Sequence, residues 1–125
     1  MKKGQGNPSR RAALFGGTGE VLVWDLLGST PIPPFTAALA CELEAGGSVG
    51  AHVQQEFAEI VIVTEGRGVA SVNGAEQPIE PGSVVALPLG KVLALRNGSN
   101  EEPLRYLIIK AVAGAAPSPP APAAT

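Results

Sequence analysis

Short apolar stretches, separated by glycine, proline and Asn-Gly pairs, run along most of the chain. Brief runs of alternating or continuous apolar residues between turn signals are typical of β-strands. They predict strands over residues 20–27, 36–44, 59–65, 68–72, 76–79, 83–87, 92–96 and 104–112. The alanines and leucines of segment 36–44 would also suit a helical turn. Asn73-Gly74, between Val72 and Ala75, predicts a two-residue type I′ hairpin.

Strands at this spacing predict an all-β domain, a sandwich or a closed barrel, because an isolated hairpin cannot bury its apolar face. Within the strand that starts at Glu59, residues 59, 61 and 63 share one face and residues 60 and 62 share the other. Both faces are largely apolar. One is expected to line the barrel and the other to pack on a second sheet or a partner subunit, so we expect a homodimer.

Length and composition fit one domain of this kind: the chain has 125 residues, with 16 Gly and 12 Pro to form its turns. We place the domain at residues 14–113. Residues 1–13 carry Lys2, Lys3, Arg10 and Arg11 without an acidic residue, and residues 114–125 are rich in proline and alanine. Neither end can bury a core, so both are expected to be disordered and without chemistry.

Charge and cysteine content exclude several classes of function. The net charge is −2, and the acidic balance outside the basic arm argues against nucleic-acid binding. A single cysteine, Cys41, excludes an internal disulfide and is expected to be a small core residue. No apolar run is long enough to span a membrane. Ser9-Arg10-Arg11 faintly resembles an export signal, but Gly16 to Asp25 break up the apolar region after it, so a cytoplasmic protein is the expectation.

The only histidine, His52, lies in a pattern of spaced residues that resembles the two motifs of the cupin family. The first motif is matched by Gly46, His52, Glu59 and Gly66, with Gln54 where a second histidine is expected. The second motif is matched by Gly82, Pro88, Gly90 and Asn97, with Leu93 in place of its histidine. The resemblance covers residues 46–97 and implies a jelly-roll β-barrel, with flanking strands completing it.

In cupins, three histidines and one glutamate typically hold a divalent metal such as iron, manganese, nickel or zinc. The resemblance therefore implies that His52 and Glu59 are metal ligands and that Gln54 supplies at most a weaker amide oxygen. Leu93 can supply no ligand, although it should point at the same interior position. The expected metal site is weak or vestigial.

Three functions remain open. The first is a small-molecule-binding barrel without a tightly held metal, in which His52, Gln54 and Glu59 orient the polar end of the ligand. Its apolar wall would be formed by Val61, Val63, Leu93 and Leu95. The second is an enzyme: a metal-dependent oxygenase or isomerase, or a metal-free isomerase or epimerase that uses His52 and Glu59 as acid and base. The third is a structural or regulatory dimer with no occupied pocket.

Simpler interpretations stand beside these roles. His52 can be a polar side chain inside the barrel, hydrogen-bonded to Gln54 or Glu59. Glu59 can be a general base with a raised pKa, or it can be kept for hydrogen bonds with His52. Glu56 could replace a lost ligand, but a place in the solvated turn before the next strand is the expectation.

Overall fold

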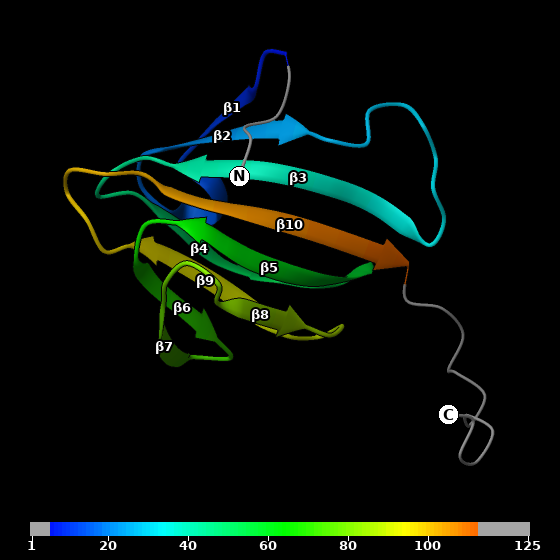
Figure 1. Cartoon of the computed structure of the whole chain (residues 1–125). Coiled ribbons are helices and arrows are strands. Elements are labelled where there is room, and N and C mark those ends of the chain that lie inside the picture. Colours follow the sequence, from blue (N-terminus) through cyan, green and yellow to red (C-terminus); the bar gives the residue numbers. More distant parts are fainter. Residues whose placement is uncertain (1–5, 113–125) are drawn as a thin grey trace.

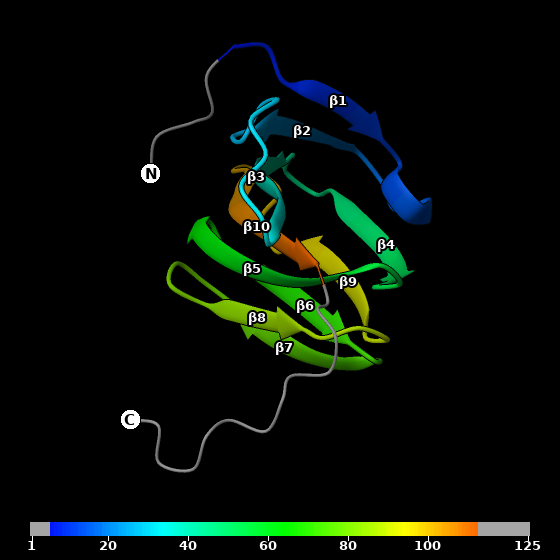
Figure 2. The same ribbon diagram turned by 90° about the vertical axis from the view of Figure 1, so that its right-hand side faces the viewer.

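A computed structural model describes residues 6–112, which form two antiparallel sheets that face each other (Figures 1 and 2). One sheet has six strands in the order β1-β2-β3-β10-β5-β8, and the other has four in the order β4-β9-β6-β7. The strands are β1 (Ser9–Ala12), β2 (Glu20–Asp25), β3 (Phe35–Leu43), β4 (Ser48–Val53), β5 (Phe57–Glu65), β6 (Gly68–Val72), β7 (Ala75–Ile79), β8 (Val84–Leu87), β9 (Val92–Asn97) and β10 (Leu104–Val112), with a 3-10 helix, η1 (Leu14–Gly16). The prediction of an all-β jelly roll is confirmed.

Turn chemistry and apolar runs located most strands well. Segment 36–44 could also have formed a helical turn. In the structure, residues 36–43 belong to β3, a regular strand that pairs with both β2 and β10. Asn73 and Gly74 have φ angles of 52° and 84° and join β6 to β7. A type I′ turn needs positive φ at both central residues, so the predicted hairpin is present.

The C-terminal strand β10 lies inside the larger sheet, between β3 and β5 (Figure 1). Alternate residues of these strands point into the space between the sheets, where they bury an apolar core. Its largest fully buried side chains are Val21, Leu43, Val61, Val63, Leu87, Leu93 and Leu104. These side chains belong to one continuous apolar core between the sheets.

The basic N-terminal segment differs from its prediction. Ser9–Ala12, assigned from the sequence to a disordered arm, forms β1 and pairs with β2 from Ser9↔Val23 to Ala12↔Glu20. Backbone pairing with an existing sheet edge stabilises a strand that has no apolar pattern of its own. Residues 1–5 and 113–125, which include the predicted Pro/Ala tail, lie outside the described residues.

Helix η1 presses its backbone against β4. A Cβ atom built on Gly50 would meet the Phe15 carbonyl oxygen at 1.8 Å, and one built on Gly17 would meet the Ser48 oxygen at 2.1 Å. Only glycine allows two backbones to approach this closely. Phe15 itself has a positive φ of 53°, so the segment is held in an uncommon conformation by its contacts. None of the helices within residues 6–112 is long and apolar enough to cross a membrane.

Candidate functional site

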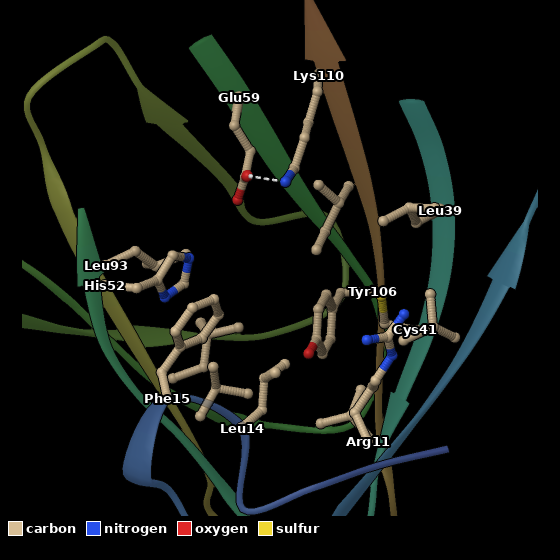
Figure 3. A pocket seen from close by; sticks show the side chains of 15 residues that line it. Arg11, Leu14, Phe15, Leu39, Cys41, His52, Glu59, Leu93, Tyr106 and Lys110 are labelled. Atoms are coloured by element: carbon tan, nitrogen blue, oxygen red, sulfur yellow. Dashed lines mark ion pairs between the residues drawn. The ribbon is translucent and has the colours of Figure 1, made fainter. Parts of the chain in front are cut away.

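A cavity of about 210 Å³ lies between the two sheets (Figure 3). Apolar side chains from both sheets and from η1 form most of its wall, and a small set of polar groups interrupts it. The apolar members are Leu14, Phe15, Val21, Val23, Leu39, Val49, Leu93, Leu95 and Ile108. The others are Arg11, Cys41, His52, Glu59, Tyr106 and Lys110. A mostly apolar cavity with a few converging polar groups is the usual form of a small-molecule site.

Strand periodicity places the polar residues. Tyr106, Ile108 and Lys110 alternate along β10, so all three side chains face the cavity. Glu59 on β5 is the register partner of Lys110 and points to the same side. Arg11 reaches the cavity from β1, the strand that the sequence had placed in a disordered arm.

Lys110 and Glu59 form an ion pair in the cavity wall, with 3.8 Å between Nζ and Oε1 (Figure 3). Glu59 is 4% exposed, and its Oε2 is buried with no hydrogen-bond partner among residues 6–112. Burial raises the pKa of Glu59, because a desolvated carboxylate is disfavoured, and the Lys110 ammonium opposes that shift. The charges of Lys110 and Glu59 therefore compensate each other, but Oε2 of Glu59 lacks a hydrogen bond.

His52 has both ring nitrogens engaged. Nδ1 lies 3.3 Å from the Gly50 carbonyl oxygen, and Nε2 lies 3.3 Å from Nε2 of Gln54. A neutral ring with its proton on Nδ1 satisfies both contacts: it donates to Gly50 and accepts from the amide of Gln54. Burial lowers the pKa of His52, which favours this neutral form. The Phe15 ring stacks on the imidazole, with 4.1 Å between centroids and 13° between planes.

The structure separates the residues that the motifs had grouped. His52, Glu59, Leu93 and Leu95 line the cavity, and Leu93 is the register partner of His52. Gln54 is buried just beyond the end of β4, where it contacts His52 without lining the cavity. Val61 and Val63 do not line the cavity, because they are packed into the apolar core. Glu56 is exposed, as expected for a turn.

These residues do not fit the divalent metal that the motifs imply. Both nitrogens of His52 already have partners, Leu93 offers no donor atom, and the cation beside Glu59 is the ammonium of Lys110. An ammonium next to the carboxylate disfavours a second cation at the same place. Within the described part of the chain, no three His, Cys, Asp or Glu side chains form a group that could hold a metal ion. His52 is hydrogen-bonded to Gln54, as its simpler interpretation predicts.

Three hydrogen-bond donors that the motifs do not contain face the cavity. Among residues 6–112, the Arg11 guanidinium and the Tyr106 hydroxyl have no hydrogen-bond or ion-pair partner, and Lys110 has only the ion pair with Glu59. Burial raises the pKa of Tyr106 well above its usual value, so its hydroxyl stays protonated and can donate. The sequence offered one signal for this group: Lys110 interrupts the apolar run of β10 and lies four residues after Tyr106, so the two side chains share a face of the strand.

Comparison with protein families supports the assignment of the fold. The family model described as a cupin domain matches residues 39–110. A protein of Thermotoga maritima called oxalate-binding protein is 30% identical over 118 residues, which are 87% of this chain and 97% of that protein.

Solved structures agree with this comparison. The crystal structure of a predicted oxalate decarboxylase from Thermotoga maritima has a TM-score of 0.79 and 28% identity, covering 85% of this chain and 92% of that one. A cupin 2 conserved barrel domain protein from Salinispora arenicola has a TM-score of 0.65 and 29% identity, covering 74% of this chain and 76% of that one.

Proposed function

The chain belongs to the cupin family, and from that premise we propose that it is a binding protein for a small organic molecule whose cavity works without a metal ion. The Lys110 ammonium lies beside Glu59 in place of a metal cation, and the surrounding apolar side chains contact the hydrocarbon part of the ligand. Such a site fixes the orientation of a ligand through a few polar contacts and gains affinity from apolar burial.

One observation carries the proposal: donors without a partner among the described residues line a mostly apolar cavity. Its volume of about 210 Å³ corresponds to about seven water molecules at ~30 Å³ each, which sets the scale of the ligand. Arg11 and Lys110 bring positive charge, and the relative named for oxalate binding favours an organic acid as ligand. Tyr106 is buried, and a buried donor without an acceptor costs free energy, so a ligand that supplies an acceptor is stabilised there; Arg11 is exposed and adds its charge at the edge of the cavity.

The geometry of His52 disfavours the enzymatic alternatives. A general acid or base must reach the substrate proton through a free ring nitrogen, whereas both nitrogens of His52 have protein partners and the Phe15 ring covers one face. Metal-dependent chemistry requires ligands that this cavity does not offer. In their observed arrangement, the side chains of the cavity can bind a ligand.

Thermal unfolding of the full chain with a panel of small organic acids, alcohols and amines, in the presence of EDTA, tests the proposal. An acid is expected to raise Tm by mass action, and calorimetry should give a one-site isotherm. Ile108→Phe, which fills the cavity, should abolish the shift. Ala94→Phe, on the outer face of the other sheet, should not. A panel without any binder would contradict the proposal, and binding that needs added metal would favour the metal-dependent alternative.

We also propose that the protein is a homodimer through the outer face of the six-stranded sheet. Ile60 and Val84 are 37% and 59% exposed there, and a groove lined by Phe35, Ala86 and Ile109 adjoins Ile60. Exposed apolar patches of this kind are typical of subunit contacts. Light scattering at micromolar concentration should give the mass of a dimer, and a monomer mass would contradict the proposal.

A further inference from the structure

The cavity has two chemically different polar ends (Figure 3). On one side, the exposed Arg11 and the buried Tyr106 both border the cavity, and both are hydrogen-bond donors without an acceptor among the described residues. At the other end, Lys110 and Glu59 present a donor beside an acceptor. Four residues of extended strand separate Tyr106 from Lys110, about 13 Å at ~3.3 Å per residue, so the ends are distinct.

The Arg11 end suits a carboxylate. A guanidinium and a hydroxyl can both donate to its oxygens, and hydrogen bonds to a charged group are the strong ones. Cys41, which also lines the cavity, cannot compete as an anion, because burial raises the pKa of its thiol to about 12. This end therefore has positive charge with no internal counterion.

The Lys110 end suits a hydroxyl group. A hydroxyl accepts from the ammonium and donates to the carboxylate at the same time, which an ionised carboxylate or a protonated amine cannot do. The acceptor is available, because Oε2 of Glu59 has no hydrogen-bond partner although the side chain is almost fully buried. The last torsion of a glutamate side chain is broad, so a small rotation can present either oxygen to the cavity. A second carboxylate would instead face the charge of Glu59.

Between the two ends the wall is mostly apolar, with Ile108 and Leu39 on one side and Leu93 on the other. His52 also borders the cavity beside Leu93, but both of its ring nitrogens have protein partners. Building on the proposed binding function, we infer that the ligand is a short aliphatic hydroxycarboxylate, held with its carboxylate at Arg11 and Tyr106 and its hydroxyl between Lys110 and Glu59. Its hydrocarbon chain fills the apolar middle of the cavity.

Matched ligands test this inference by isothermal titration calorimetry on the full chain. The six-carbon set is 6-hydroxyhexanoate, hexanoate, hexane-1,6-diol and adipate, and 4-hydroxybutyrate with butyrate forms a shorter pair. For at least one of the two chain lengths, the hydroxy acid should bind about tenfold more tightly than the acid without a hydroxyl. The acid without a hydroxyl lacks one hydrogen bond to a charged side chain. The diol and adipate should both bind more weakly than the hydroxy acid of the same length.

Variants assign each end. Arg11→Gln should weaken binding of both acids about tenfold. Arg10→Gln, next to it on β1 but paired with Glu20, should leave binding unchanged and serves as the matched control. Glu59→Gln or Lys110→Met should reduce the preference for the hydroxyl while leaving the affinity for hexanoate similar.

Equal affinity for the hydroxy and deoxy acids, tighter binding of adipate, or equal binding of the diol would overturn the inference. In each of these outcomes the proposed binding function stands. If none of the series binds but another compound of the panel does, and Ile108→Phe abolishes that binding, the inference alone is wrong. If no compound of any class binds, both fail.

Discussion

Asn97 and Glu59 are buried polar residues of the two sequence motifs, and their surroundings are opposite. They are 5% and 4% exposed. Asn97 Nδ2 donates to the carbonyl oxygens of Leu43, Glu44 and Glu102, and its Oδ1 accepts from the Ser99 amide at 2.8 Å. Glu59 has an ion pair at 3.8 Å and an oxygen with no hydrogen bond.

The difference shows that burial alone does not reveal what a polar residue does. A side chain whose hydrogen bonds are all satisfied joins several chain segments and stabilises the fold. A buried side chain with an unsatisfied atom is destabilising in the free protein and gains its partner from a ligand. Within one barrel, the residues around Asn97 therefore stabilise the fold, whereas the residues around Glu59 form the proposed binding site.

Asn97→Ala should have the largest effect on the free energy of unfolding. A small effect would contradict the contrast drawn between Asn97 and Glu59. The change removes the donor from three backbone carbonyl oxygens, of which that of Leu43 is buried and those of Glu44 and Glu102 are part-buried. We expect the free energy of unfolding to fall by about 3 kcal/mol, from about 1 kcal/mol per lost hydrogen bond. Urea unfolding measures it. Ligand affinity, measured where the variant is folded, should be unchanged; a loss of stability well below 1 kcal/mol would mean that Asn97 is not the joint between these segments.

Rebuilding a metal site at the Glu59 cluster should give the next largest effect. Gln54→His with Leu93→His adds two imidazoles near His52, and Lys110→Met removes the competing ammonium. The triple variant should be stabilised by nickel, zinc or manganese by about 2.7 kcal/mol at a hundredfold excess over Kd. Wild type should show little shift, and the variant that keeps Lys110 should lie between them.

Two results would contradict this expectation. Equal metal stabilisation of wild type and triple variant would mean that the native His52, Gln54 and Glu59 side chains already bind metal well. If a folded triple variant shows no stabilisation, these side chains do not converge on one point. Calorimetric Tm values with and without EDTA distinguish the two results.

Glu59→Gln should have a smaller effect, visible mainly in its pH dependence. Since the pKa of Glu59 is raised in the folded protein, the folded state keeps this proton to higher pH than the unfolded chain, where it is lost near 4.5. The wild type therefore has a contribution to its unfolding free energy that falls as pH rises above 4.5 and through the folded pKa. The variant lacks it, so its stability relative to wild type should improve over that range. A difference that does not vary with pH, measured by urea unfolding, would argue against the desolvated carboxylate.

The smallest effect is expected at Cys41, which borders the cavity. Its pKa of about 12 keeps the thiol protonated at pH 8, and the thiolate is the reactive form. Iodoacetamide should not label the native protein detectably by mass spectrometry, whereas protein in concentrated urea should be labelled. Rapid labelling of the native protein would mean that solvent reaches Cys41 through the cavity. Glu59, which lines the same cavity, would then be less desolvated than its 4% exposure implies.

Local signals in the sequence predicted much of the fold. The Asn73-Gly74 turn and the apolar runs at residues 68–72 and 104–112 specify their own conformation, and the structure reproduces them. Strand β1 could not be predicted in this way, because Ser9–Ala12 has no apolar alternation and forms by pairing with β2. Its neighbour η1 depends on a close approach between Gly50 and Phe15 that only the folded chain reveals.

The site was only partly predictable, for a related reason. Motif spacing placed His52, Glu59 and Leu93 around one cavity, but it could not show that Gln54 contacts His52 without lining that cavity or that Val63 is packed into the core. Arg11 and Lys110 enter the cavity through strand pairings outside the motifs. The positive charge of the site is thus set by tertiary structure and by register, which periodicity within one strand does not reveal.

The central position of β10 governs how the chain can fold as it is synthesised. Strands β3 and β5 both pair with β10, which is the last described strand to leave the ribosome. Until then, one edge of each strand is unpaired, and such edges are prone to associate with other chains. At about 5–20 residues per second, the edge of β5 stays open for several seconds after its own synthesis. Nascent chains should therefore need protection by chaperones until residues 104–112 emerge, and folding of the barrel should be complete only after β10 has been synthesised.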